Sequence, residues 1–130
     1  MPSPELLAPA GSLTMLDTAF AYGATAIYAG QPRYSLRVRN NAFGDLDVLK
    51  AGIDRAHGLG HPFYLVSNIY PHTAKLKTYL KDMAPVIALG PDALIMSDPG
   101  LILLIRENWP DMPIHLSVQA NTVNSAAVRF

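Results

Sequence analysis

Cysteine is absent from this sequence of 130 residues, and charged residues are scarce. Without thiols the chain can form no disulfide, offers no cysteine nucleophile and cannot ligate a metal or an iron–sulfur cluster through sulfur. Ten basic and ten acidic residues give a formal net charge of zero, so no overall field attracts nucleic acid. A polyanionic ligand would have to be bound by a local patch.

Long apolar runs and a secretion signal are also missing. The longest apolar stretches, Pro85 to Leu89 and Leu101 to Ile105, are far shorter than the roughly 20 residues that span a bilayer. Residues 1–5 contain neither the basic nor the apolar part of a signal peptide. Half of the residues are hydrophobic, which is enough for a substantial core. We therefore expect a cytoplasmic domain, or part of one, with no membrane association.

Short apolar runs alternate with amphipathic segments along the chain. The runs that predict strands are residues 5–10, 24–29, 62–67, 93–96 and 113–118. Helices are expected from a cap at Ser12 onward and over residues 45–59, 75–89, 101–108 and 125–130. Pro85 is expected to kink or split the third of these helices. A glycine stands between helix and strand at three places, Gly23, Gly60 and Gly90. This recurrence indicates that one strand–helix unit is repeated along the chain.

This alternation predicts an α/β fold with a parallel sheet. One architecture that fits is an open doubly wound sheet, and the other is the first part of a (β/α)8 barrel, which typically needs about 250 residues. The end of the sequence inside a helix and the lack of a glycine-rich phosphate loop favour the barrel. Residues 1–130 are then the N-terminal part of one barrel domain, and its open sheet edges invite self-association.

The loop after the second predicted strand, residues 31–43, is basic. It contains three arginines and two asparagines but no acid: Arg33, Arg37, Arg39, Asn40 and Asn41. A guanidinium presents a planar fork of donors that matches a carboxylate or a phosphate. The loop therefore predicts a binding site for an anion. The alternative is a solvated basic loop in which Leu36 and Val38 pack inward.

Polar residues also follow the other strands. They are Asn68 and His72 after the third strand, Ser97 and Asp98 after the fourth, and Ser117, Gln119 and Asn121 after the fifth. Both architectures place ligands at the carboxyl ends of parallel strands. We therefore expect these side chains and the arginine loop to meet at one edge of the sheet.

Each of these residues has two interpretations. His72 is a candidate general acid–base, or a surface histidine. Asp98 could orient a ligand, or cap the helix that begins at Pro99. Gln119 and Asn121 alternate in a segment predicted to be extended, so both could bond a planar ligand or satisfy loop backbone. Ser97 and Ser117 have no adjacent base in the sequence, and no histidine–carboxylate cluster predicts a metal site.

Four stretches of the sequence resemble one known family. They are residues 5–11 (ELLAPAG), 28–41 (YAGQPRYSLRVRNN), 92–100 (DALIMSDPG) and 113–121 (PIHLSVQAN). They are similar to the start of peptidase family U32, the collagenase-like proteins. The resemblance implies a barrel-type N-terminal domain and a role in hydroxylation. In the branch that acts on tRNA, it implies formation of 5-hydroxyuridine at the wobble position with prephenate as the associated metabolite.

The resemblance also implies an iron–sulfur cluster, held by cysteines beyond this segment, so the segment alone is expected to be inactive. Prephenate or a tRNA phosphate would pair with the arginine loop, while Asn68, His72, Gln119 and Asn121 orient the ligand. A collagenase-like peptidase, a hydrolase, is the second interpretation, although no protease constellation is present. A non-catalytic module that binds tRNA or a carboxylate metabolite is the third.

Overall fold

The computed structural model describes residues 3–31, 33–36, 39 and 41–130. Its five strands form one parallel sheet in the order β1-β2-β3-β4-β5. The strands are β1 (Leu7–Pro9), β2 (Ala26–Gly30), β3 (Phe63–Ser67), β4 (Ala93–Met96) and β5 (Ile114–Leu116). A doubly wound sheet reverses its strand order at a switch point, and these strands follow the sequence without reversal. The α/β fold is confirmed, and the order is that of part of a barrel.

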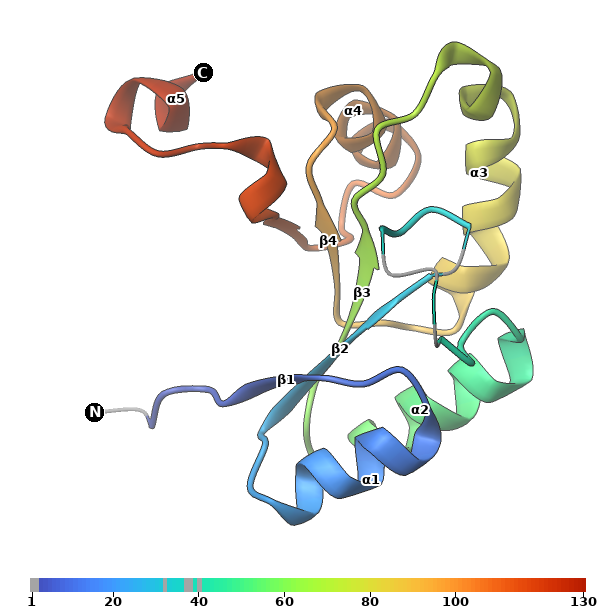
Figure 1. The fold of residues 1–130 in the computed structure, drawn as a ribbon. Helices are drawn as coiled ribbons and strands as arrows, with labels where there is room; N and C mark the ends of the chain where they lie inside the picture. Colours follow the sequence, from blue (N-terminus) through green and yellow to red (C-terminus); the bar gives the residue numbers. More distant parts are fainter. Residues whose placement is uncertain (1–2, 32, 37–38, 40) are drawn as a thin grey trace.

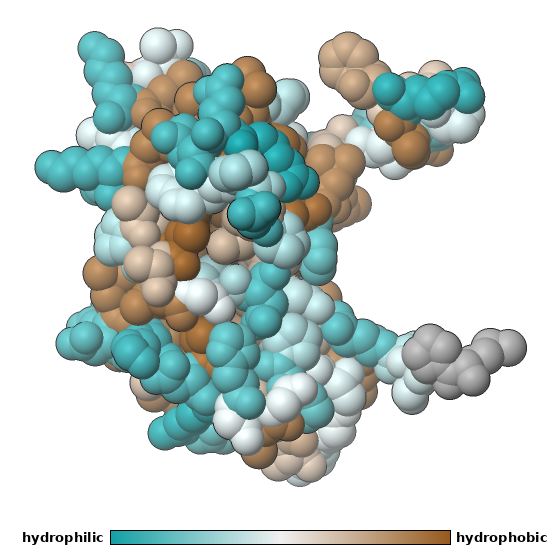
Figure 2. Space-filling view, turned by 180° about the vertical axis from the view of Figure 1, so that it is seen from behind, coloured by the Kyte–Doolittle hydropathy of each residue, from teal (hydrophilic) through white to brown (hydrophobic). Residues whose placement is uncertain are grey.

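Helices follow the strands in the same order. They are α1 (Leu13–Ala21), α2 (Leu46–Gly58), α3 (Thr73–Ala88), α4 (Pro99–Asn108), the 3-10 turn η1 (Val118–Ala120) and α5 (Ser125–Arg129). Helices α1 to α4 lie on one side of the twisted sheet (Figure 1), and Figure 2 shows an indentation beside the projecting C-terminal segment. Within the described residues, no helix is both long and apolar enough to cross a membrane.

Most local signals in the sequence act as expected. The Ser12 hydroxyl caps α1 by accepting a hydrogen bond from the Met15 amide at 3.2 Å. Gly23, Gly60 and Gly90 adopt positive φ angles of 97°, 76° and 78°. Pro85, however, does not split α3, which runs unbroken to Ala88. Pro85 lies in the last turn, where its missing N–H removes one bond near the helix end.

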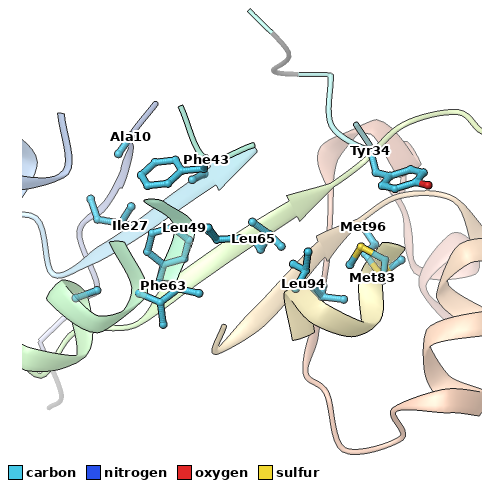
Figure 3. Close-up of a cluster of buried hydrophobic side chains, with 14 of the residues drawn as sticks. Ala10, Ile27, Tyr34, Phe43, Leu49, Phe63, Leu65, Met83, Leu94 and Met96 are labelled. Carbon is cyan, nitrogen blue, oxygen red and sulfur yellow. The ribbon is translucent and has the colours of Figure 1, made fainter. Parts of the chain in front are cut away.

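The core lies between the sheet and these four helices. Alternate strand residues such as Ile27, Leu65 and Leu94 are fully buried there. Tyr34 and Phe43, from the arginine loop and its end, are each 1% exposed. Figure 3 shows Phe43 near Leu49 and Phe63 in one part of the core, and Tyr34 above Met83 and Met96 in another. Two aromatic side chains thus anchor the loop to the core.

The Phe43 anchor predicts an unusual response to mutation of Gly52 on α2. A glycine-to-alanine change inside a helix normally stabilises a protein by roughly 1 kcal/mol. A Cβ at Gly52 would lie 2.8 Å from Phe43 Cε1 and 3.3 Å from Phe63 Cε2. We therefore expect Gly52→Ala to lower the free energy of unfolding by about 1–3 kcal/mol, as overpacking does.

Urea denaturation would measure this change, with Gly58→Ala as the matched control. A Cβ at Gly58 meets nothing within 4 Å, so that variant should be slightly stabilised. Equal stabilisation of both variants would contradict the proposed packing of Phe43.

Candidate functional site

Backbone hydrogen bonds join the segments that follow the strands into one edge. The amide of Gln31 donates to the Val66 carbonyl at 3.2 Å, and that of Ser117 donates to the Met96 carbonyl at 2.7 Å. The amide of Ala42 donates to the Gly11 carbonyl at 2.8 Å, which returns the arginine loop to the end of β1. We call this carboxyl edge of the sheet, with the loops after β1 to β5, the rim.

Asn68 connects the loops of the rim. Its side chain is nearly buried, with 5% of the residue exposed. Its Oδ1 accepts from the amide of Leu36 at 3.1 Å, and its Nδ2 donates to Oε1 of Gln119 at 3.1 Å. The Asn68 carbonyl accepts from the Ser97 hydroxyl at 3.4 Å. The expected meeting of Asn68 and Gln119 is confirmed. The two hydrogen bonds of its side-chain amide make Asn68 a residue that positions the loops.

A hollow of about 230 Å³, which we call the rim hollow, lies at the ends of β1 and β2. Its lining comprises Pro9, Ala10, Gly11, Met15, Tyr28, Gly30, Arg39 and Asn41. Arg39 is exposed, makes no ion pair within the described residues and is the one charged residue of this lining. The first turn of α1 borders the hollow and adds a partial positive charge. The hollow is therefore suited to an anion.

Asn41 has a structural role beside Arg39. Its Nδ2 donates to the Gly30 carbonyl, and its Oδ1 accepts from the amide of Phe43 at 2.9 Å. These bonds close the arginine loop onto the end of β2, so Asn41 shapes the wall of the rim hollow.

Arg33 is paired with an acid from another element. The sequence interpretation considered only the loop itself, which contains no acid. Nη1 of Arg33 lies 2.8 Å from Oδ2 of Asp82, which is supplied by α3. The Tyr34 hydroxyl donates to the same carboxylate oxygen and lies 3.3 Å from the Thr78 hydroxyl. Burial, together with the bond to Asp82, raises the pKa of Tyr34. The acid was missed because it is distant in sequence and only the fold brings it to the loop.

The other predicted residues are more dispersed. Arg37 and Asn40 lie outside the described residues. His72 is exposed at the start of α3, and its side chain makes no capping bond there. Asp98 caps α4, since its Oδ2 accepts from the amide of Leu101 at 2.8 Å. Of its two interpretations, the structure shows the cap.

The prediction of an extended segment at Gln119 and Asn121 is wrong. Residues 118–120 form η1, and Asn121 ends it with a left-handed φ of 52°. Ser117 immediately precedes η1, and its hydroxyl accepts a hydrogen bond from the amide of Gln119 at 3.5 Å. This bond favours a turn. The two side chains consequently do not alternate along a strand, and only Gln119 bonds to Asn68.

A larger hollow of about 780 Å³ lies at the ends of β4 and β5. It contains Asp98 and Gln119, but much of its lining is exposed hydrocarbon: Leu103, Leu116, Val128 and Phe130. Its one cationic residue, Arg106, donates to the carbonyls of Pro110 and Met112. This hollow is a poorer match to an anion than the rim hollow.

The sequence interpretation missed Gln31. This residue follows β2 directly, is 8% exposed, and its Oε1 is a buried atom with no hydrogen-bond partner among the described residues. Leaving such an acceptor unpaired costs about 1–3 kcal/mol. The sequence did offer a signal for Gln31, because its side-chain amide comes immediately after Gly30, which ends an apolar strand.

Three serines near the rim have hydroxyl partners that would not activate them. The hydroxyl of Ser67 bonds to that of Tyr79 at 2.9 Å, and the hydroxyls of Ser97 and Ser117 bond to the Asn68 carbonyl and to Gln119. None of these serines is paired with a histidine or a carboxylate. No group of three potential metal ligands occurs in the part of the chain that the structure describes.

Asn68→Ala should loosen the rim. The substitution leaves the amide of Leu36 without its acceptor, which we expect to lower the free energy of unfolding by about 1–3 kcal/mol. Amide hydrogen exchange of Leu36 should also become faster. Gln119→Ala is the control, because it removes the other bond of Asn68 and leaves the Leu36 bond in place. Unchanged exchange at Leu36 in Asn68→Ala would exclude this role.

The buried hydroxyl of Tyr79 predicts a loss of stability at high pH. Burial raises the pKa of Tyr79 to about 12, from about 10 in the unfolded chain. The stabilisation that depends on the protonated Tyr79 hydroxyl is fully present below pH 10. It is lost as the pH rises through the folded-state pKa, and the free energy of unfolding then falls by up to about 2–3 kcal/mol. Urea denaturation across this range should show a smaller loss for Tyr79→Phe. Tyr22→Phe, at a side chain that is 87% exposed, should leave the loss unchanged.

Comparison with known proteins adds relatives of high identity. The chain is 66% identical over 127 residues to "tRNA hydroxylation protein P" of Escherichia coli K12, covering 98% of this chain and 28% of the relative. It is 68% identical over 127 residues to the protein of the same name in Haemophilus influenzae, covering 98% of this chain and 27% of that relative. The chain thus spans little more than a quarter of the length of these relatives.

A solved structure has the same fold. The structure of a U32 peptidase superimposes with a TM-score of 0.70 at 15% sequence identity, covering 98% of this chain and 55% of the other. The family model described as "Peptidase family U32" matches residues 11–130. The expected resemblance is therefore confirmed, and the chain belongs to peptidase family U32.

Proposed function

We propose that this chain is the N-terminal part of a tRNA-hydroxylating protein that forms 5-hydroxyuridine at the wobble position, with prephenate as the associated metabolite. One observation carries the proposal: 66% and 68% identity, over 98% of the chain, to two proteins named for tRNA hydroxylation. The matched region includes the whole rim. A tRNA substrate would place the protein in the cytoplasm.

The rim hollow supports the anionic part of this proposal. Arg39 stands in it without an acidic partner among the described residues, whereas Arg33 is paired with Asp82. A charge-assisted hydrogen bond to a carboxylate or phosphate contributes about 1.5–3 kcal/mol. In our proposal Arg39 binds the anion, Arg37 assists it, and His72 is the candidate acid–base at the same edge.

An iron–sulfur cluster does not fit the residues of this chain. Such a cluster is held by cysteine thiolates, and the sequence contains none. We propose that any cluster is held by a part of the complete protein outside these 130 residues. The contribution of this segment is then to bind and orient the substrates.

The family name favours peptidase activity as the second candidate. The serine hydroxyls at the rim bond to an amide side chain and a carbonyl instead of a base, so they lack activation. Cleavage of peptides by the purified complete protein, abolished by a single substitution at the rim, would support the peptidase. Binding of tRNA without any modified product would instead support a non-catalytic binding module.

The sheet edges support the further proposal that this segment alone self-associates. Strands β1 and β5 each pair with only one neighbour in the described sheet. Exposed edge strands offer unpaired backbone groups to a second chain. Light scattering of the isolated segment would decide the point, and a stable monomer would contradict it.

Arg39→Ala in the complete protein should reduce tRNA hydroxylation at least about tenfold, because a charge-assisted bond is lost. The measurement is mass spectrometry of nucleosides from tRNA of cells that lack any other copy of the protein. Arg37→Ala should act in the same direction. Lys50→Ala is the control, since Lys50 pairs with Asp54 on α2 and does not line the rim hollow. Normal hydroxylation in Arg39→Ala would rule out the anion site.

A further inference from the structure

Helix α3 carries three lysines, Lys75, Lys77 and Lys81, and one acid, Asp82. The carboxylate of Asp82 is engaged by Arg33 and Tyr34. None of the three lysines makes an ion pair within the described residues. Since the whole chain has zero net charge, this helix concentrates positive charge locally.

Lys77 and Lys81 lie on the outer side of α3, whereas Lys75 projects toward the side that carries Asp82. The buried residues of the helix, Tyr79, Met83 and Val86, face the sheet, while all three lysines are exposed. Lys77 and Lys81 are four residues apart and therefore neighbours on the helix surface. Arg33 is joined to this helix through Asp82 and is itself exposed, with 66% of its side chain accessible. We call Lys77 and Lys81 the basic face; Arg33 and Lys75 flank it on the side of Asp82.

The basic face lies near the rim. Helix α3 starts at Thr73, directly after the loop that carries Asn68 and His72. The same loop exposes Tyr70, whose accessible fraction is 64%. An exposed aromatic ring can stack on an unpaired base, and neighbouring cations can hold the backbone of the same strand. Lys77 and Lys81 are the fifth and ninth of the 16 residues of α3, so they lie about 6–12 Å along the helix from the end that starts at the rim.

We propose that the basic face docks the phosphate backbone of the RNA substrate and so positions the target base at the rim. This inference rests on the proposed function and adds the surface through which the RNA binds. One turn of helix separates charges by less than the Debye length of about 8 Å at physiological salt, so the lysines act together. An anionic membrane is disfavoured as the partner, because Ala74 and Thr78, among the lysines, offer no apolar side chain large enough to insert.

The test is the salt dependence of tRNA binding by the complete protein. Each lost phosphate contact reduces the slope of log Kobs against log salt by about 0.7–0.9. We expect the double variant Lys77→Ala, Lys81→Ala to weaken binding and to reduce the slope by about 1.4–1.8. The double variant Lys77→Arg, Lys81→Arg keeps both charges and should restore the slope.

The matched control is Lys50→Ala with Arg55→Ala, which removes two exposed cations from α2 that pair with Asp54 and Asp17. Its slope should equal that of the unmodified protein. An unchanged slope in the α3 double alanine variant would overturn the basic face. So would an equal loss of slope in the α2 control, or a preference for phosphatidylserine vesicles over tRNA that depends on Lys77 and Lys81.

The two proposals are judged by different measurements. The nucleoside content of cellular tRNA tests hydroxylation, whereas the salt slope tests where the RNA docks. Hydroxylation by the complete protein together with unaltered slopes in the α3 variants would leave the proposed function standing and refute the docking surface.

Discussion

The hydrogen bonds of one buried amide, that of Asn68, hold the functional edge of this protein together. Its oxygen accepts from the backbone of the arginine loop, and its nitrogen donates to Gln119 in the segment after β5. Other bonds add to these, such as that from the Ala42 amide to the Gly11 carbonyl and that from the Ser97 hydroxyl to the Asn68 carbonyl. Because a buried unpaired amide is costly, this arrangement favours one relative position of the loops. Beside Arg39, the wall of the rim hollow is held by Asn41, whose side chain bonds to the Gly30 carbonyl and the Phe43 amide.

The charged residues of the arginine loop have two different roles. Arg33, with Tyr34, attaches the loop to α3 through Asp82, while Arg39 remains available in the rim hollow. Attachment through Asp82 also brings the loop beside the lysines of α3. A protein without net charge can thus present a basic surface, because its acids lie mostly on other elements. In the proposed function, the hollow binds a small anion and the basic face binds the RNA backbone.

Local sequence signals predicted the elements well and some contacts poorly. The strand at Ala93–Met96, the Ser12 cap and the three glycine turns were predicted correctly, because each depends on neighbouring residues. A split of α3 at Pro85 and an extended segment at residues 118–121 were predicted, and neither occurs. Pro85 lies in the last turn of α3, and a serine hydroxyl favours the turn over an extended strand. Of the candidate site, the convergence of Asn68 and Gln119 was predicted, but the bond that joins them was not.

The sequence by itself determined a parallel α/β unit with polar strand ends, because hydrophobic periodicity and glycine positions act over a few residues. Only the tertiary structure decided that Arg33 pairs with an acid, which amide ties the loops and which helix supplies that acid. Those outcomes depend on contacts between residues far apart along the chain, such as Tyr34 with Asp82 and Asn68 with Gln119.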